Sequence, residues 1–220
     1  MWRRGASVDF EALRAEMVAR QIEARGVTHA RALAAMRAVP RHAFVPEDLR
    51  AAAYEDRPLP IGEGQTISQP YMVAAMTAAL DPPAAGRVLE VGTGSGYQAA
   101  VLARLCREVV TIERHVRLAA RAREVLAQLG LTNVRVEVGD GTLGFPQAQP
   151  YDGILVTAGA PAVPAPLRAQ LADGGRLVVP VGGASYQELI VESRHGDRFT
   201  AEIRDACVFV PLVGRYGHTE

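Results

Sequence analysis

The chain of 220 residues contains no lysine, so arginine supplies every basic side chain other than histidine. The absence of lysine excludes Schiff-base chemistry and lysine nucleophiles. The 24 basic and 24 acidic residues balance to a formal charge of zero, which argues against the broad positive surface of DNA- and RNA-binding proteins. We therefore expect no nucleic-acid partner.

Cysteine and histidine are few and scattered. Cys106 and Cys207 are the two cysteines, and neither lies in the CxxC spacing typical of metal or redox sites. The five histidines are also far apart in the chain. We expect both cysteines to pack in the interior and no metal ion to be bound.

The sequence also lacks a long hydrophobic run. A membrane-spanning helix needs about 20 consecutive apolar residues, and the first residues lack the apolar stretch of a signal peptide. We therefore expect a cytoplasmic protein with no membrane partner. Apolar residues make up 49% of the chain, enough for a full core, and the length favours one domain.

A glycine-rich turn follows the strand pattern Val88 to Val91. The chain continues Gly-Thr-Gly-Ser-Gly and then becomes helical in pattern over 97–105. Glycines at this point let a ligand approach the main chain, and the helix start offers free N–H groups. The Gly-x-Gly-x-Gly spacing after Glu90 resembles motif I of the S-adenosylmethionine-dependent methyltransferases. The alternative is a tight turn that binds no ligand.

Strand and helix patterns alternate after this turn, which predicts an α/β fold with a mostly parallel sheet and helices on both faces. We expect strands at 87–91, 109–113, 134–138, 153–157 and 176–181. Helices are expected at 97–105, 116–129 and 166–171. The segments 187–193 and 201–210 alternate around Gly196-Asp197 and predict a C-terminal antiparallel hairpin.

The N-terminal third predicts a helical extension. Helices are expected at 8–25, with Ser7 or Asp9 as N-cap, and at 28–36, with Thr28 as N-cap. The proline- and glycine-containing stretch 81–86 is the best boundary in the chain. We thus expect residues 1–81 to pack on a core formed by residues 82–220, the two making a single structural unit.

The segment 54–70 is rich in proline, glycine and small polar residues and predicts an ordered loop. It ends at Pro70, a favoured first residue of a helix, here expected to run to Leu80. Ser68 and Gln69 therefore arrive at a helix N-terminus. Capping of that helix is the alternative to a role in a site.

Acidic residues end two of the predicted strands. Glu113 can accept hydrogen bonds from ribose hydroxyls, and Asp140, between two glycines, can accept the adenine amino group. A surface acid and an Asx turn are the respective alternatives. The small residues 157–161 leave space for a substrate chain beyond the fourth strand, and 171–181 resembles methyltransferase motif III, which is largely scaffold.

The whole chain, over about 9–217, resembles the protein-L-isoaspartate (D-aspartate) O-methyltransferase family. The resemblance rests on Val39-Pro40-Arg41-His42 with Phe44-Val45-Pro46, on Gly64 to Pro70, on Gly139-Asp140-Gly141 and on Phe209 to Gly214. The last residues depart from the family pattern near His218, where an aromatic side chain is expected, so their role stays open.

The resemblance implies a Rossmann-like methyltransferase fold and a function in protein repair. Such enzymes move a methyl group from S-adenosyl-L-methionine to the side-chain carboxylate of L-isoaspartyl, and in some cases D-aspartyl, residues of damaged proteins. The ester closes to a succinimide that hydrolyses partly to aspartate, and S-adenosyl-L-homocysteine is left. The implied partners are isoaspartyl-containing proteins and peptides, and we expect the protein to be a monomer.

The motifs and the resemblance together predict the site. The resemblance implies that Ser68 is the catalytic residue. The predicted cofactor-binding residues are Thr66, Ile67, Ser68, Gln69, Pro70, Glu90, Gly92, Thr93, Gly94, Glu113, Arg114, Asp140 and Gly141. The predicted substrate residues are Ile61, Gln65, Ser68, Ala158, Ala160 and Pro161, with backbone pairing to the substrate from 54–70 and from 157–161.

The residues agree with this chemistry. A carboxylate is ionised near pH 7 and needs no general base to attack a sulfonium methyl group, so the lack of an obvious catalytic base is expected. An RNA or small-molecule methyltransferase would share the glycine turn, Glu113 and Asp140 but would not need the 65–70 segment. The glycine spacing argues against an NAD(P) oxidoreductase, and the intact site residues argue against an inactive binding module.

Overall fold

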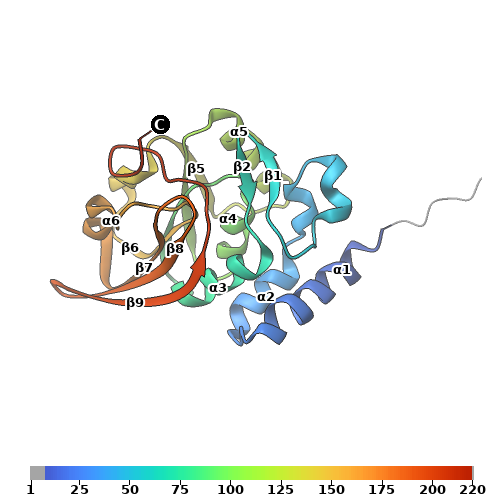
Figure 1. Cartoon of the computed structure of the whole chain (residues 1–220), viewed down its shortest axis with the longest axis horizontal. Helices are drawn as coiled ribbons and strands as arrows, with labels where there is room; N and C mark the ends of the chain where they lie inside the picture. Colours follow the sequence, from blue (N-terminus) through green and yellow to red (C-terminus); the bar gives the residue numbers. More distant parts are fainter. Residues whose placement is uncertain (1–7, 220) are drawn as a thin grey trace, which may run out of the picture.

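The computed structural model describes residues 8–219, which form one central seven-stranded sheet with helices on both faces (Figure 1). The strand order is β5-β4-β3-β6-β7-β8-β9. The bounds are β3 Arg87–Val91, β4 Glu108–Glu113, β5 Val134–Val138, β6 Tyr151–Val156, β7 Leu171–Gly182, β8 Gln187–His195 and β9 Arg198–Cys207. The predicted Rossmann-like α/β fold is thus confirmed.

The pairing of β3 fixes where a ligand can bind. β3 pairs in parallel with β4 on one side and with β6 on the other, so the chain changes direction across the sheet at this strand. Ligands of open α/β sheets bind at the carboxyl ends of the strands at such a switch point. The glycine turn that follows β3 lies at this place.

Two apolar clusters cover the two faces of the sheet, because neighbouring strand residues point to opposite sides. Val88 and Val109 belong to the larger cluster, which includes the N-terminal helices, α3 (Pro70–Leu80), α4 (Tyr97–Leu102) and α5 (Val116–Gln128). Leu89 and Val110 belong to the second cluster, which includes Leu167 of α6 (Ala165–Gln170).

The N-terminal helices differ in detail from the prediction. The first predicted helix divides into α1 (Phe10–Glu16), a π-helical turn (Met17–Ile22) and a 3₁₀ turn (Glu23–Arg25). Asp9 caps α1 by accepting hydrogen bonds from the N–H groups of residues 11 and 12, whereas Ser7 lies outside the described residues.

No helix within residues 8–219 is both long and apolar enough to cross a membrane.

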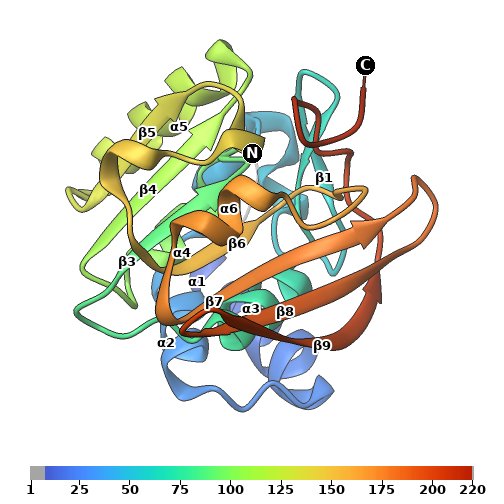
Figure 2. The same ribbon diagram turned by 90° about the vertical axis from the view of Figure 1, so that its left-hand side faces the viewer.

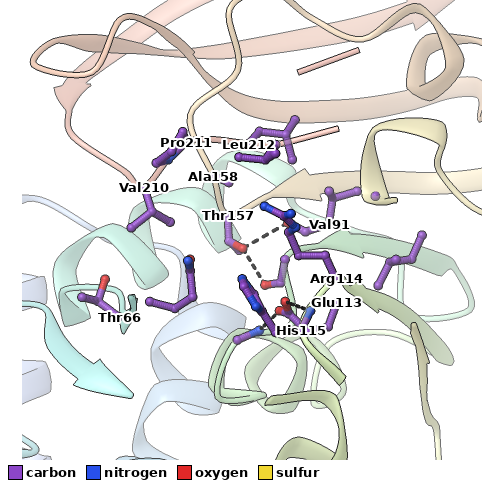
Figure 3. A pocket seen from close by; sticks show the side chains of 16 residues that line it. Thr66, Val91, Glu113, Arg114, His115, Thr157, Ala158, Val210, Pro211 and Leu212 are labelled. Carbon is purple, nitrogen blue, oxygen red and sulfur yellow. Dashed lines mark hydrogen bonds between the residues drawn. The ribbon is translucent and has the colours of Figure 1, made fainter. Parts of the chain in front are cut away.

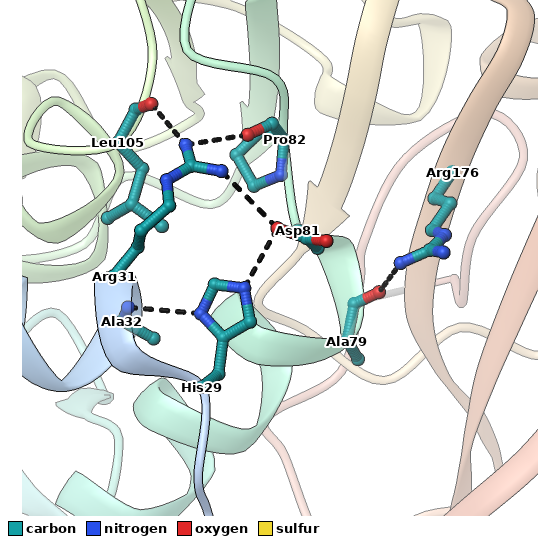
Figure 4. A network of polar contacts seen from close by, with 8 residues as sticks. All are labelled: His29, Arg31, Ala32, Ala79, Asp81, Pro82, Leu105 and Arg176. Carbon is teal, nitrogen blue, oxygen red and sulfur yellow. Dashed lines mark hydrogen bonds and ion pairs between the residues drawn. The ribbon is translucent and has the colours of Figure 1, made fainter.

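Helix α2 (Ala30–Ala38) is capped by His29, not by Thr28 as predicted, because the imidazole Nδ1 accepts the N–H of Ala32 at 3.1 Å. The other ring nitrogen lies 2.8 Å from Asp81 Oδ1, just beyond α3 (Figure 4). Arg31 donates to the carbonyl oxygens of Pro82 and Leu105 at 2.8 and 2.6 Å. The stretch predicted as a boundary is therefore tied to α2.

The segment 54–70 is not wholly a loop. It contains a two-stranded antiparallel hairpin, β1 (Leu59–Gly62) and β2 (Gln65–Ile67), turning through Glu63 and Gly64, which both have positive φ. Pro60 lies inside β1, and a proline in a run so short hides the strand from pattern analysis. The hairpin stands apart from the main sheet and leads directly into α3.

The C-terminal hairpin is present, turning at Gly196 as predicted, and its long curved strands are seen in Figure 2. However, β9 ends at Cys207 and not at 210. Residues beyond it leave the sheet and return to the end of β6, where Gly159 donates to the carbonyl of Val210 and accepts from the N–H of Leu212, both at 2.8 Å. This return brings the C-terminal segment to the switch point.

Candidate functional site

A cavity opens at the carboxyl ends of β3, β4 and β6 (Figure 3). Its walls come from six parts of the chain: the glycine turn, the end of β4, the turn after β5, the exit of β6, the β1–β2 hairpin and the C-terminal segment. The lining residues are Gln65, Thr66, Val91, Gly92, Gly94, Ile112, Glu113, Arg114, His115, Gly141, Thr157, Ala158, Val210, Pro211, Leu212 and Val213.

Glycine is required at the bottom of this cavity. Gly92 has φ of 97°, and a Cβ atom there would collide with the hydroxyl of Thr157. That hydroxyl donates to the carbonyl oxygens of Gly92 and Val91 at 2.6 and 3.0 Å, so it cannot swing away without losing these contacts. A Cβ atom at Gly141 would collide with Val91. The two glycines keep the space for a ligand open.

Glu113 lies at the cavity with its side chain almost buried, at 5% exposure. One carboxylate oxygen accepts the N–H of Gly94 at 2.8 Å, and the other accepts the N–H of His115 at 2.9 Å. These bonds fix the carboxylate against the glycine turn. Each oxygen can still accept another hydrogen bond, so Glu113 keeps the capacity predicted for ribose hydroxyls.

Asp140 organises the neighbouring turn. Its Oδ1 accepts the N–H and the hydroxyl of Thr142 at 2.9 and 2.6 Å, and its Oδ2 accepts the N–H of Arg215 at 2.8 Å. Burial acts to raise the pKa of Asp140, but the hydrogen bonds from Arg215 and Thr142 outweigh it and hold the pKa below its usual value. Gly141 lines the cavity, whereas Asp140 does not. The Asx turn, which was the alternative to adenine binding by Asp140, is present.

The same contacts give the C-terminal segment a structure. Tyr216 donates its N–H to the hydroxyl of Thr142 at 3.1 Å, and His218 donates its N–H to the carbonyl of Leu212 at 2.7 Å. The last described residues therefore form a closed turn clamped to Asp140. The last residues, whose role the sequence left open, hold the Leu212–Val213 wall of the cavity in place.

Glu90 is fully buried beneath the glycine turn and does not line the cavity. Its Oε2 accepts the hydroxyl of Thr111, which lies 2.6 Å from the hydroxyl of Thr93. Burial raises the pKa of Glu90 to about 8. Glu90 can therefore reach a ligand only through intervening groups.

Ser68 lies where two hollows meet. One is an open groove of about 420 Å³ that shares Thr66, Thr157, Val210 and Pro211 with the cavity. The groove is lined by Pro58, Thr66, Ser68, Gln69, Met72, Thr157, Ala184, Ala206, Cys207, Val208, Phe209, Val210 and Pro211. The other is a small pocket that Ser68 shares with Thr66, Ile67, Gly92 and Thr93.

The capping alternative for this segment is wrong. Helix α3 begins at Pro70, and neither Ser68 nor Gln69 caps it through a side-chain hydrogen bond. The amide of Gln69 instead donates to the carbonyl of Asp56 at 3.3 Å. Ser68 thus keeps its hydroxyl beside the two hollows.

Three predicted substrate residues are not brought into the groove. Ile61 is buried, and its carbonyl accepts from Arg121 at 3.0 Å. Ala160 is buried with its N–H bonded to Pro180 and its carbonyl to Gly182, and Pro161 lies exposed beyond it. At Gly159 and Ala160, the backbone groups expected to pair with the substrate already bond to other parts of the chain. Ala158 and Gln65 do line the cavity.

Several residues of the cavity wall were not among the predicted site residues. His115 follows Glu113, and its side chain lines the cavity. Thr157 closes the bottom, and Val210 to Val213 form one side. The 209–214 motif was the available signal for the last of these, but nothing in the pattern indicated that it returns to β6. No group of three His, Cys, Asp or Glu side chains within the described part of the chain could hold a metal ion.

The lining suits a nucleoside with an attached polar chain. Val91, Ile112 and Leu212 provide apolar contacts, Glu113 provides an acceptor, and the two glycines that tolerate no Cβ leave backbone exposed to a ligand. S-adenosyl-L-methionine has these parts, and the residues present fit it.

Comparisons with known proteins agree with this site. The chain is 57% identical to a protein-L-isoaspartate O-methyltransferase of Methanoregula boonei, over 93% of this chain and 94% of that protein. It is 56% identical to a protein of the same name from Trichlorobacter lovleyi, over 96% and 97% of the two chains.

Solved structures agree as well. A protein-L-isoaspartate O-methyltransferase structure superposes with a TM-score of 0.84 at 29% identity, over 93% of this chain and 67% of that one. A Plasmodium falciparum structure, described as a complex with S-adenosyl-L-homocysteine, shares the fold with a TM-score of 0.79 at 23% identity, over 94% and 99% of the two chains.

The profile of one family covers nearly the whole chain, matching residues 12–217. Enzymes of this family use S-adenosyl-L-methionine as methyl donor. The chain therefore belongs to the protein-L-isoaspartate (D-aspartate) O-methyltransferase family, and it is an S-adenosyl-L-methionine-dependent methyltransferase.

Proposed function

We propose that this enzyme methylates the side-chain carboxylate of L-isoaspartyl residues in damaged proteins and peptides, with the donor in the cavity and the damaged segment in the groove. The observation that carries the proposal is the position of Ser68. It lines the groove, and it also lines the small pocket that reaches Gly92 and Thr93 of the glycine turn. A carboxylate held by Ser68 would face the donor.

The chain has to supply alignment more than acid–base chemistry. The donor provides an electrophilic methyl group, and the substrate carboxylate is already ionised near neutral pH. The new oxygen–carbon bond forms as the sulfur–carbon bond breaks, and the electron pair of the broken bond stays on sulfur. Ser68 donates a hydrogen bond to the carboxylate and fixes its direction of approach, and such alignment can lower a barrier by roughly 7–11 kcal/mol.

The groove suits a substrate defined by its damaged residue and not by its neighbours. None of its described lining residues is charged, and Met72, Val208 and Phe209 offer apolar surface. An open, uncharged groove accepts many flanking side chains. We therefore expect weak sequence preference around the isoaspartyl residue.

The test is methyl transfer to matched peptides. An isoaspartyl peptide and its aspartyl twin are incubated with enzyme and radiolabelled donor. A D-aspartyl twin tests whether the enzyme also methylates D-aspartyl residues. We expect labelling of the isoaspartyl peptide and little of the aspartyl peptide. Equal labelling of both, or of neither, would contradict the proposal.

We further propose that the enzyme acts as a cytoplasmic monomer without a nucleic-acid or membrane partner. The edge strand β9 carries Arg198, Glu202, Arg204 and Asp205 at exposed positions, and charged edges oppose pairing between sheets. Light scattering at micromolar concentration should give the mass of one chain. Cell fractionation tests the compartment.

A further inference from the structure

The carboxyl group of Glu90 is the most unusual polar group outside the walls of the site. It is completely buried in β3, and its Oε1 has no hydrogen-bond partner among the described residues. The charged neighbour that acts on it is another carboxylate, Glu113. An ionised carboxylate is costly in such surroundings, because burial and the like charge of Glu113 both disfavour it.

A short relay of hydroxyl groups connects this buried acid to the site. Thr111 donates to Glu90 Oε2, so the hydrogen atom between the two threonines comes from Thr93. Thr93 lines the small pocket that contains Ser68 and Gly92. With Glu90 ionised, the lone pairs of Thr93 face the site. With Glu90 protonated at Oε2, the relay can reverse and present a hydrogen atom there.

We propose that Glu90 distinguishes the methyl donor from the spent product by charge: it is protonated in the free enzyme, releases its proton when the positively charged donor binds, and regains one when the uncharged thioether replaces the sulfonium. This inference rests on the proposed use of the cavity for the donor and goes beyond it. Glu90 is a positioning residue, since it acts on the ligand through Thr111 and Thr93.

Glu90 responds to the change in the charge of the bound ligand during the reaction. The sulfonium carries one positive charge that the thioether product lacks, and a cation near a buried acid favours the ionised form. Methyl transfer removes that cation, so the carboxylate of Glu90 becomes unfavourable until a proton returns from solvent. Once Glu90 is protonated again, the site does not bind the product in preference to fresh donor.

The burial of Glu90 raises its pKa to about 8, so the protonated form predominates at pH 7. Donor binding near pH 7 should therefore release close to one proton. The donor Kd should fall by up to about tenfold per pH unit as the pH rises toward 8, and level off above it. Product binding should show a much weaker dependence.

The experiment is calorimetric titration of the whole enzyme with S-adenosyl-L-methionine and with S-adenosyl-L-homocysteine. Each titration is run at pH 7 in two buffers of different ionisation enthalpy, which gives the number of protons released. For Glu90→Gln we expect no donor-specific proton release, a pH-independent donor Kd, and about a tenfold loss in the preference for donor over product. His195→Gln, at the exposed end of β8 and outside the cavity, is the control and should keep the donor-specific release.

Thr111 offers a second pair of variants if Glu90→Gln does not fold. Thr111→Val removes the hydrogen bond that favours the ionised form, so the pH at which the donor Kd levels off should move upward by about one unit. Thr111→Ser keeps the hydroxyl and should leave that pH unchanged. A purely structural role of Thr111 would weaken donor and product alike at every pH.

Equal proton release with donor and product, release that survives in Glu90→Gln, or an unshifted pH in Thr111→Val would overturn the inference. These outcomes are independent of the substrate assigned above. Failure to label an isoaspartyl peptide, with donor-specific proton release intact, would reject the proposed function and leave the role of Glu90 standing.

Discussion

At the scale of single residues, the site separates groups that touch a ligand from groups that shape the space for it. Ser68 stands between groove and pocket, with no part in capping the helix that follows. Gly92, by contrast, is important because it has no side chain, which leaves the space beside Thr157 open. Different variants therefore test the two kinds of residue.

Ser68→Ala should lower kcat toward an isoaspartyl peptide by about 10- to 100-fold, the value of one hydrogen bond to a charged group. The thermal midpoint should hardly change, because the hydroxyl supports no helix cap. Ser193→Ala, a serine of β8 outside the groove, is the matched control and should keep full activity. Wild-type turnover by Ser68→Ala would remove Ser68 from the mechanism.

Gly92→Ala should abolish donor binding and destabilise the fold, because the new Cβ meets Thr157 at a positive φ. Gly130→Ala is the control: Gly130 also has a positive φ, of 68°, but open space around it. We expect the control to cost about 1 kcal/mol of stability and to bind the donor normally. Calorimetry and denaturant unfolding measure the two effects separately.

At this scale the sequence identified many of the residues that meet at the site. Gly92, Gly94, Glu113 and Gly141 line the predicted cavity, since a strand-to-glycine pattern fixes its own local geometry. Ile61 and Ala160, predicted as substrate residues, are buried outside the groove, because burial and hydrogen bonding depend on contacts from distant segments.

At the scale of elements, two short segments complete the site. The β1–β2 hairpin supplies Gln65 and Thr66, and the segment after β9 supplies the opposite wall. Neither segment was predicted from hydrophobic periodicity. The strands of the hairpin are short and β1 contains proline, and the segment after β9 is irregular, so neither shows a clear pattern. Their positions are set by hydrogen bonds to other elements.

Arg31→Ala should lower the free energy of unfolding by about 1–2 kcal/mol, because its guanidinium joins α2 to the carbonyl groups of Pro82 and Leu105. Arg37→Ala on the same helix removes an exposed ion pair with Glu23 and should cost less than about 1 kcal/mol. Urea unfolding of both variants compares the two. Similar losses would show that the network in Figure 4 does not anchor α2.

Asp140→Asn should loosen the C-terminal segment, because the amide nitrogen cannot accept the N–H of Arg215. We expect a loss of about 1 kcal/mol and faster hydrogen exchange at Arg215 and Tyr216. The folded-state pKa of Asp140 is lowered, so its contribution is present above the unfolded value of about 3.9 and is lost as the pH falls through the lower folded value. The difference between variant and wild type should therefore vanish in acid, as exchange measured against pH would reveal.

At the scale of the whole molecule, the N-terminal region and the sheet share one core. Met17, Ile22 and Met36 belong to the same buried cluster as Tyr97 and Ala122 of the nucleotide-binding half. The division at residue 81 thus separates segments of sequence that are packed together.

A fragment of residues 82–220 should fail to fold, since removing the N-terminal region would expose the face of the sheet that α3 and the earlier helices cover. A fragment of residues 8–220 is the control and should unfold in one cooperative transition. Circular dichroism and calorimetry report both. A compact, cooperatively unfolding 82–220 fragment would show that the core stands alone.

The sequence by itself determined the alternation of strands and helices, the glycine turn and the family, because these depend on local spacing and on residues adjacent in the chain. Tertiary structure alone decided that Leu212 and Val213 face Glu113 across a cavity, that Asp140 clamps the C-terminal turn, and that Glu90 has no partner for one of its oxygens. These features arise where distant segments meet. Burial and hydrogen-bond satisfaction there are properties of the packed chain, which no local pattern records.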